Sequence, residues 1–401
     1  MAESISFNRR VESMQPSATL AMKSRATAMR REGHPVVALS AGEPDFDTPA
    51  PIAQAGKDAI ETGFTHYTEN PGTMELREAI AHKLQRDNDL DYAPDQILCS
   101  NGAKQSIALA THVLCDAGDE VLIPAPYWVS YPEMARFAGA EPSVVPTGVE
   151  DAYKLTPAAL DAAITDRTRL LILCSPSNPT GTVYTPEELE GLAEVLRDNE
   201  HVFVLSDEIY EYVLYDAEHR AFASLPGMKE RTITVNGFSK GFAMTGWRLG
   251  YMAGPSAIVK ESAKVQGQFT SAPCSISQKA GTAAMQMDLE PVHEMVAAFR
   301  ERRDFVMDRL RAMDGVRCPT PEGAFYVYPD VSDYFGTTAP NGEIIEDSSD
   351  LCFYLLEDRY VALVPGTAFG APNGLRISYA SSMEDLETAM DRIDDGLAAL
   401  R

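Results

Sequence analysis

The chain has 401 residues, of which 45% are hydrophobic and 23% are charged, a composition typical of a folded globular protein. Its 59 acidic residues outnumber the 34 basic ones and give a formal net charge of −25. Because so negative a surface repels phosphate backbones and anionic lipids, we expect neither nucleic acid nor a membrane as the main partner.

The first residues, 1–6 (MAESIS), show no basic segment followed by an apolar run, so we expect no secretory signal. No apolar stretch approaches the roughly 20 residues that span a bilayer. The six cysteines are scattered without a C-x-x-C pair, which is typical of reduced thiols. These features predict a cytoplasmic protein, and we assign no metal ligands.

Short β-rich runs alternate with amphipathic helical segments between residues 95 and 255. The runs span residues 120–123, 170–174, 202–205, 232–235 and 249–253. Helical patterns over 105–115 and 186–197 lie between them, the second with Thr185 as its N-cap. This alternation predicts a mostly parallel sheet with helices on both faces, in which ligands bind beyond the carboxyl ends of the strands.

A long charged helix over residues 292–313 leads into a second unit. Strand-like pieces follow at 324–328, 361–364 and 375–379, with helices between them. We therefore expect an α/β protein with a large domain over residues 46–285. A smaller α+β domain would combine residues 1–45 with residues 286–401.

The strongest local signal is the segment 236–248 (NGFSKGFAMTGWR), directly after the strand at 232–235. A lysine there, Lys240, can be shielded from water, and burial favours the neutral amine that attacks an aldehyde. Arg248 offers the planar guanidinium that binds a phosphate through two hydrogen bonds. Taken alone, the segment is explained more readily by a surface lysine and a structural arginine.

Polar residues follow two neighbouring strands as well. Asp207, after the strand at 202–205, can pair with a protonated ring nitrogen and make the ring an electron sink. Tyr210 can donate to a phenolate oxygen on the same ring. Asn178 lies in an Asn-Pro-Thr-Gly turn after the strand at 170–174. A turn-capping role for Asp207 and ordinary turn chemistry at Asn178 stay open at this point.

Two further loops fit a phosphorylated planar ligand. Gly102 and Ala103 precede the helix at 105–115, and free backbone N–H groups at a helix N-terminus suit a phosphate. Trp128, one of two tryptophans, can stack on a planar ring. Glycine before a helix and an aromatic residue after a strand are both common without a ligand.

Together and in this order, these motifs resemble the fold-type-I aminotransferases of class I and II. The likeness is greatest to the bacterial and archaeal aspartate aminotransferases with a Met-Thr-Gly-Trp-Arg signature. It extends from residues 16–19 (PSAT) through 41–46 (AGEPDF) to 375–379 (LRISY). It implies a pyridoxal 5'-phosphate-dependent enzyme whose partners are small amino acids and 2-oxo acids.

The resemblance implies roles around the cofactor ring. Lys240 would hold the cofactor covalently and act as the general acid and base. Asp207 would hold the pyridinium nitrogen, and Tyr210 and Asn178 the ring oxygen. Trp128 would stack on the ring face.

The resemblance also implies a phosphate site and a homodimer. Arg248 and the backbone of Gly102 and Ala103 would bind the phosphate. Tyr67 would reach the phosphate of the neighbouring subunit, so that two subunits share each active site. Where many members carry a serine three residues before the lysine, this chain has Gly237. Some phosphate contact must therefore come from elsewhere, and we do not count Ser239, the residue just before the lysine, among the sites.

The substrate contacts are implied in the same way. Arg376 would clamp the α-carboxylate, assisted by Asn178, Trp128 and the backbone of Gly42. Lys104 would meet a distal carboxylate, with Thr19 nearby. A lysine at a helix N-terminus opposes the helix dipole, which a second carboxylate would justify. We therefore expect aspartate and glutamate as amino donors, with oxaloacetate and 2-oxoglutarate as oxo acids.

Several alternatives stay open. Aromatic amino acids are possible donors, because apolar pocket walls discriminate weakly. Prephenate users carry a basic residue just after the methionine of the N-terminal segment, where this chain has Gln15. A β-eliminating lyase would share the cofactor residues. A ligand-sensing transcription regulator is disfavoured by the charge, and a nucleotide-binding enzyme by the lack of a G-x-G-x-x-G or G-K-[ST] loop.

Overall fold

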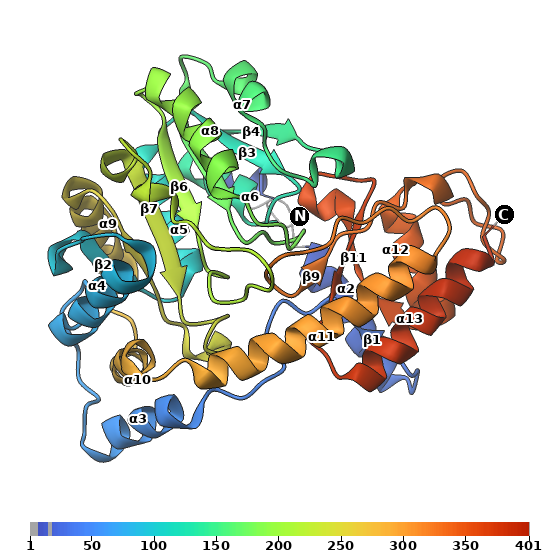
Figure 1. Cartoon of the computed structure of the whole chain (residues 1–401), viewed down its shortest axis with the longest axis horizontal. Coiled ribbons are helices and arrows are strands. Elements are labelled where there is room, and N and C mark those ends of the chain that lie inside the picture. Colours follow the sequence, from blue (N-terminus) through green and yellow to red (C-terminus); the bar gives the residue numbers. More distant parts are fainter. Residues whose placement is uncertain (1–6, 15–17, 401) are drawn as a thin grey trace, which may run out of the picture.

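The computed structural model contains a seven-stranded sheet flanked by helices, with a second group of strands and helices beside it (Figure 1). The structure describes residues 7–14 and 18–400, with the backbone alone at 18–21 and 23. In sheet order the strands are β2 (Ile97–Ser100), β8 (Gly250–Ala253), β7 (Thr232–Gly237), β6 (Phe203–Asp207), β5 (Thr168–Cys174), β3 (Glu120–Ala125) and β4 (Glu141–Pro146).

The sheet is mostly parallel, as the sequence predicts. Pairing is parallel from β7 through to β4, and only β8 runs antiparallel to its neighbours, β2 and β7. Each of the five predicted runs overlaps one strand, and β2 and β4 are additional.

Helices cover both faces of the sheet. Successive side chains of each buried strand point to opposite faces and pack against the helices on each side. In β3, Val121 and Ile123 pack with α5 and α9, whereas Leu122 packs with α8 on the other face. Thr185 caps α8 in a capping box with Glu188, which confirms the predicted N-cap. The helices of this part are α3 (Ala50–Glu61), α4 (Met74–Asn88), α5 (Ala103–Leu114), α6 (Tyr131–Ala138), α7 (Pro157–Ala163), α8 (Pro186–Asp198), α9 (Ser256–Phe269) and α10 (Ser275–Gln286).

The second group joins both ends of the chain. β1 pairs in parallel with β10, with Val37 opposite Val361, and one apolar core contains both Met22 and Leu351. This packing agrees with a small unit built from both termini, whose boundaries at residues 46 and 285 stay a prediction. Its elements are α1 (Arg9–Glu12), α2 (Ala18–Arg31), β1 (Val37–Ala38), α11 (Glu290–Ala312), β9 (Tyr326–Val327), α12 (Ser348–Arg359), β10 (Val361–Ala362), β11 (Val364–Pro365), β12 (Leu375–Ser378) and α13 (Met383–Ala398).

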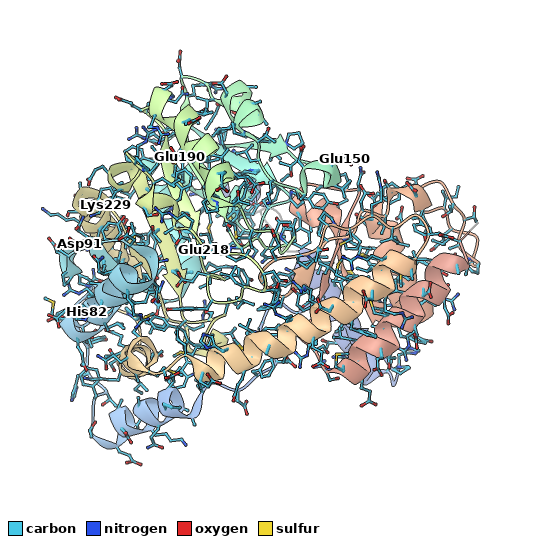
Figure 2. All side chains as sticks on the ribbon, viewed as in Figure 1. His82, Asp91, Glu150, Glu190, Glu218 and Lys229 are labelled. Atoms are coloured by element: carbon cyan, nitrogen blue, oxygen red, sulfur yellow. The ribbon has the colours of Figure 1, made fainter. Side chains whose placement is uncertain are left out.

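Acidic side chains are spread over the surface. Asp91, Glu150 and Glu218, for example, are exposed at separate places (Figure 2). In residues 7–14 and 18–400, each helix is too short or too polar to cross a membrane.

Candidate active site

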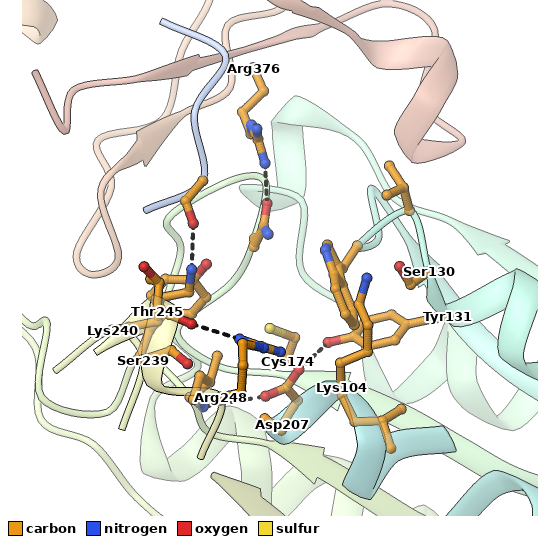
Figure 3. Close-up of a pocket in the computed structure, with 18 residues that line it drawn as sticks. Lys104, Ser130, Tyr131, Cys174, Asp207, Ser239, Lys240, Thr245, Arg248 and Arg376 are labelled. Carbon is orange, nitrogen blue, oxygen red and sulfur yellow. Dashed lines mark hydrogen bonds between the residues drawn. The ribbon is translucent and has the colours of Figure 1, made fainter. Parts of the chain in front are cut away.

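A pocket of about 400 Å³ lies at the carboxyl ends of the parallel strands, where the segments after β3, β5, β6 and β7 meet β12 (Figure 3). Cavities in this position are the usual ligand sites of α/β sheets. The residues predicted from sequence that line it are Gly42, Ala103, Lys104, Trp128, Asn178, Asp207, Tyr210, Lys240, Arg248 and Arg376.

Lys240 lies just beyond β7, and its ammonium group donates a hydrogen bond to the carbonyl of Gly42. Burial lowers the pKa of Lys240 to about 8, although the charge of Glu43 opposes this shift. With a pKa near 8, roughly a tenth of the amine is neutral at about pH 7, against less than about 0.1% for an ordinary lysine. Burial thus favours the neutral form of the Lys240 amine, which is the form that can act as a nucleophile or accept a proton.

Asp207 ends β6 and is almost fully buried. Its Oδ2 accepts a 2.6 Å hydrogen bond from the Tyr131 hydroxyl, and its Oδ1 accepts one from the Ile209 backbone. Burial raises the pKa of Asp207 to about 6, although the bond from Tyr131 opposes the shift. No salt bridge to Asp207 occurs within the described chain. A cationic group bound in the pocket would therefore stabilise the ionised carboxylate.

The neighbouring carboxylate, Glu208, has different partners. It accepts hydrogen bonds from the Ser206 hydroxyl at 2.8 Å and from the Phe222 backbone, and lies 3.1 Å from His219 Nε2. It does not line the pocket, because successive side chains of a strand point to opposite faces. Asp207 is therefore the carboxylate available to a ligand.

An anion-binding corner forms where α5 begins. Gly102 precedes the helix at a positive φ of 83°, and a Cβ at this position would lie 2.6 Å from Arg248 Nη2. Only glycine therefore permits this approach of the guanidinium to the helix N-terminus. Ala103 and Ser239 line the same pocket. Free N–H groups at a helix N-terminus beside an arginine suit a phosphate.

A second arginine, Arg376 on β12, lies on the opposite side of the pocket from Arg248 (Figure 3). It donates to Asn178 Oδ1 at 2.9 Å and to the Ser40 carbonyl at 2.8 Å. Burial lowers its pKa, and no carboxylate in the described part of the chain pairs with it. Its Nε lacks a hydrogen-bond partner among the described residues. A buried guanidinium with neutral partners is well suited to an incoming carboxylate.

Lys104 and Trp128 form the wall on the α5 side. The Lys104 ammonium lies 4.7 Å from the centre of the Trp128 ring. Burial lowers the pKa of Lys104, and the charge of Arg248 adds to this effect. A carboxylate bound here would stabilise the ammonium.

Two predicted residues, Gly102 and Tyr67, do not line the pocket, and a third, Thr19, cannot be placed relative to it. Gly102 lies behind it, against Arg248. The Tyr67 side chain is fully exposed in the single chain. Thr19 belongs to α2, but its side chain lies outside the described residues, as does all of Gln15.

The sequence interpretation missed eight of the lining residues, among them Tyr131, Cys174 and Ser239. Tyr131 bonds to Asp207, which is 76 positions away in sequence, so no local pattern reveals it. Its place three residues after Trp128 was the only available hint. Ser239, which we set aside, lies on the Arg248 side of the pocket in Figure 3 and joins the candidate phosphate contacts.

The fold and the lysine-centred pocket define an α/β enzyme of the fold-type-I aminotransferase kind. The family model described as "Aminotransferase class I and II" matches residues 34–393. The chain belongs to the class I and II aminotransferase family.

Relatives cover nearly the whole chain. It is 54% identical to an aspartate aminotransferase of Pinus pinaster, over 99% of this chain and 82% of the relative. It is 53% identical to a bifunctional aspartate aminotransferase and glutamate/aspartate-prephenate aminotransferase of Petunia hybrida, over 99% and 84%. The solved structure of the Rhizobium meliloti aspartate aminotransferase superimposes with a TM-score of 0.96 at 44% identity, covering 99% of this chain and all of the other.

Proposed function

We propose that the chain moves an amino group between L-aspartate or L-glutamate and a 2-oxo acid such as 2-oxoglutarate, with pyridoxal 5'-phosphate held on Lys240. One observation carries the proposal: a lysine with a lowered pKa, a buried carboxylate and a buried arginine without an anionic partner converge on one pocket. The names of the most similar relatives support aspartate as the donor.

The residues present fit this cofactor. The anion-binding corner of Arg248 and the α5 N-terminus matches its phosphate, and Asp207 matches its ring nitrogen. Tyr210 and Trp128 also line the pocket, where the Tyr210 hydroxyl would bond the ring oxygen and Trp128 would cover the ring. When bound, the cofactor supplies an electron sink that stabilises negative charge on the substrate Cα.

The chain's own residues then select and move the proton. Arg376 and Asn178, which share a hydrogen bond, would fix the substrate α-carboxylate and thereby orient the Cα–H bond toward Lys240. Once the substrate amino group has displaced it from the cofactor, the Lys240 amine would take this proton and return it to the cofactor carbon to which the lysine had been bonded. The Tyr131 hydroxyl partly offsets the effect of burial on Asp207, whose ionised carboxylate would keep the ring nitrogen of the bound cofactor protonated.

We also propose that the active unit is a homodimer in which Tyr67 reaches the phosphate of the neighbouring subunit. The full exposure of the Tyr67 side chain in the single chain supports this, because large aromatic side chains are enriched at interfaces. In each subunit, the expected division at residues 46 and 285 would place Arg376 in the small domain and Lys240 in the large domain.

The direct test is an amino-transfer assay on purified protein loaded with pyridoxal phosphate. L-aspartate and 2-oxoglutarate are expected to give oxaloacetate and L-glutamate in equal amounts. Pyruvate and ammonia from a β-substituted amino acid, without transfer, would instead indicate the eliminating alternative. Including prephenate as acceptor tests the second activity named for the Petunia relative.

Replacing Lys104 by methionine is expected to raise KM for L-aspartate by about 10- to 100-fold, because a hydrogen bond to a charged group is lost. The kcat/KM for L-phenylalanine should hold or rise, since a cation is removed from the pocket wall beside Trp128. Steady-state kinetics with both donors measure the change. Lys260→Met, on the exposed side of α9, is the control, and equal losses for both donors would refute the assignment.

Replacing Tyr131 by phenylalanine removes the hydroxyl that bonds Asp207. Because this bond opposes the raised pKa, the pKa of Asp207 is expected to rise further above 6 in the variant. Affinity for pyridoxal phosphate should then fall about fivefold at about pH 8, and more steeply than in wild type toward about pH 6. Fluorescence titration of the cofactor-free protein at several pH values checks this; parallel curves would contradict it.

A further inference from the structure

Tyr326, which the sequence interpretation did not select, lies directly behind the pocket. It opens β9, which pairs antiparallel with β12, and its side chain is fully buried. Its ring packs against the guanidinium of Arg376, with 4.6 Å between the Arg376 Cζ and the ring centre. Tyr326 thus supports the predicted carboxylate clamp from behind.

The hydroxyl of Tyr326 meets the ring-oxygen side of the site. Its oxygen lies 2.9 Å from the Tyr210 hydroxyl oxygen, and the two rings meet edge to face. A Cβ added to Gly42 would lie 3.3 Å from the same Tyr326 oxygen. One phenol therefore adjoins three groups of the proposed site, which come from segments far apart in the sequence: Tyr210, Arg376 and Gly42.

The direction of the Tyr210–Tyr326 hydrogen bond has a functional consequence. Each phenol carries one proton, so only one of the two can donate to the other. Burial raises the pKa of both hydroxyls, so both protons stay in place. If Tyr326 donates, the Tyr210 proton is free to point at a ligand. Without the Tyr326 hydroxyl, no other hydrogen-bond partner among the described residues orients the Tyr210 hydroxyl.

We propose that Tyr326 is a positioning residue that orients the Tyr210 hydroxyl toward the ring oxygen of the bound cofactor, an inference that rests on the proposed function. Tyr326 itself touches no reacting atom. It acts through Tyr210, while its ring keeps Arg376 in place.

The test is Tyr326→Phe, which removes the hydroxyl and keeps the ring. A hydrogen bond from Tyr210 to the ring oxygen of the cofactor stabilises the negative charge on that oxygen. When the Tyr210 hydroxyl is less ordered, this charge is less stable, and the protonated form of the bound cofactor is favoured. The midpoint of the spectral pH titration of the bound cofactor is therefore expected to rise by about 0.5–1 pH unit. Affinity of the cofactor-free protein for pyridoxal phosphate, read from tryptophan fluorescence, should fall about threefold.

A double-mutant cycle separates positioning from general damage. In a Tyr210→Phe background, adding Tyr326→Phe should move the midpoint no further. Tyr379→Phe is the matched control, because it breaks another buried tyrosine pair, Tyr379 Oη to Tyr215 Oη at 3.0 Å, away from the pocket. That control should leave the midpoint unchanged.

Three outcomes would overturn the inference: an unchanged midpoint in Tyr326→Phe, an additive shift in the Tyr210→Phe background, or an equal shift in Tyr379→Phe. A Tyr326→Phe protein that fails to fold would also overturn it, because one oriented hydroxyl is too small a part of the stability to be required. A wild-type protein without any cofactor band would refute the proposed function itself, so the two failures are distinguishable.

Discussion

Replacing Lys240 by alanine is expected to lower the rate of amino transfer by about 10⁴-fold, the upper range for loss of a general acid and base. The variant loses both the covalent attachment of pyridoxal phosphate and the proton carrier. Folding should be unaffected, because the amine makes one hydrogen bond, to the Gly42 carbonyl. The measurement is the steady-state rate with L-aspartate and 2-oxoglutarate, beside the melting temperature of the cofactor-free protein.

The pH dependence of cofactor uptake by the wild-type protein is a second test of the role of Lys240. Only the neutral amine attacks an aldehyde, and burial lowers the pKa of Lys240 to about 8. Uptake should therefore quicken about tenfold per pH unit below about pH 8 and level off above it. Lys260→Ala is the control for Lys240→Ala, and its rate of amino transfer should equal that of wild type. Activity in Lys240→Ala within tenfold of wild type would contradict the assignment.

Replacing Asp207 by asparagine is expected to reduce amino transfer by about 10²- to 10³-fold, as for removal of one preorganised electrostatic group. The same change should raise the melting temperature of the cofactor-free protein by about 2–4 °C at about pH 8. The wild-type pKa of about 6 lies above the ordinary 3.8, so the folded state disfavours the ionised carboxylate. Calorimetry and kinetics on the same preparations measure both effects.

The pKa of Asp207 in the folded and unfolded states determines the pH range in which this stability effect appears. The penalty of the ionised, buried Asp207 is fully present above about pH 6 and vanishes below about pH 4, where the carboxyl is protonated in both states. The advantage of Asp207→Asn should therefore shrink as the pH falls. Asp91→Asn, on an exposed residue, is the control. A destabilised cofactor-free Asp207→Asn protein would indicate a structural carboxylate instead.

Much of the fold was predictable because the sheet strands have local signals. β3, β5, β6 and β7 are apolar runs bounded by turns, and α8 begins at a capping box. β4 was missed because only Val145 of its six residues is buried, so it lacks the apolar run of a central strand. β2 was missed although its four residues are all buried, because this short strand runs directly into a turn and the start of a helix and shows no separate strand pattern.

The candidate site was predictable where residues follow strands directly. Asp207, Asn178 and Lys240 belong to this group, since the carboxyl ends of neighbouring parallel strands meet at one edge. Tyr131 and Tyr326 were not predictable, because each matters through a partner distant in sequence, Asp207 and Tyr210 respectively. Their roles depend on tertiary contacts that no local pattern encodes.

The lowered pKa of Lys240 also depends on the folded structure. Its cause is burial, which arises when the segment after β7 packs under the Gly42 loop and β12. The sequence predicts the amine, but only the packing supplies its chemistry. The roles of the site residues stay predictions, including those of Tyr67 and Thr19.

The absorption spectrum of the purified protein loaded with pyridoxal phosphate, recorded before and after L-aspartate, tests the central claim most directly. We expect a near-visible band that L-aspartate converts to a band at shorter wavelength and that 2-oxoglutarate restores. The band should be missing from the protein fraction of Lys240→Ala after removal of free cofactor. A wild-type protein that gains no band with added cofactor, or whose band ignores both L-aspartate and L-glutamate, would contradict it.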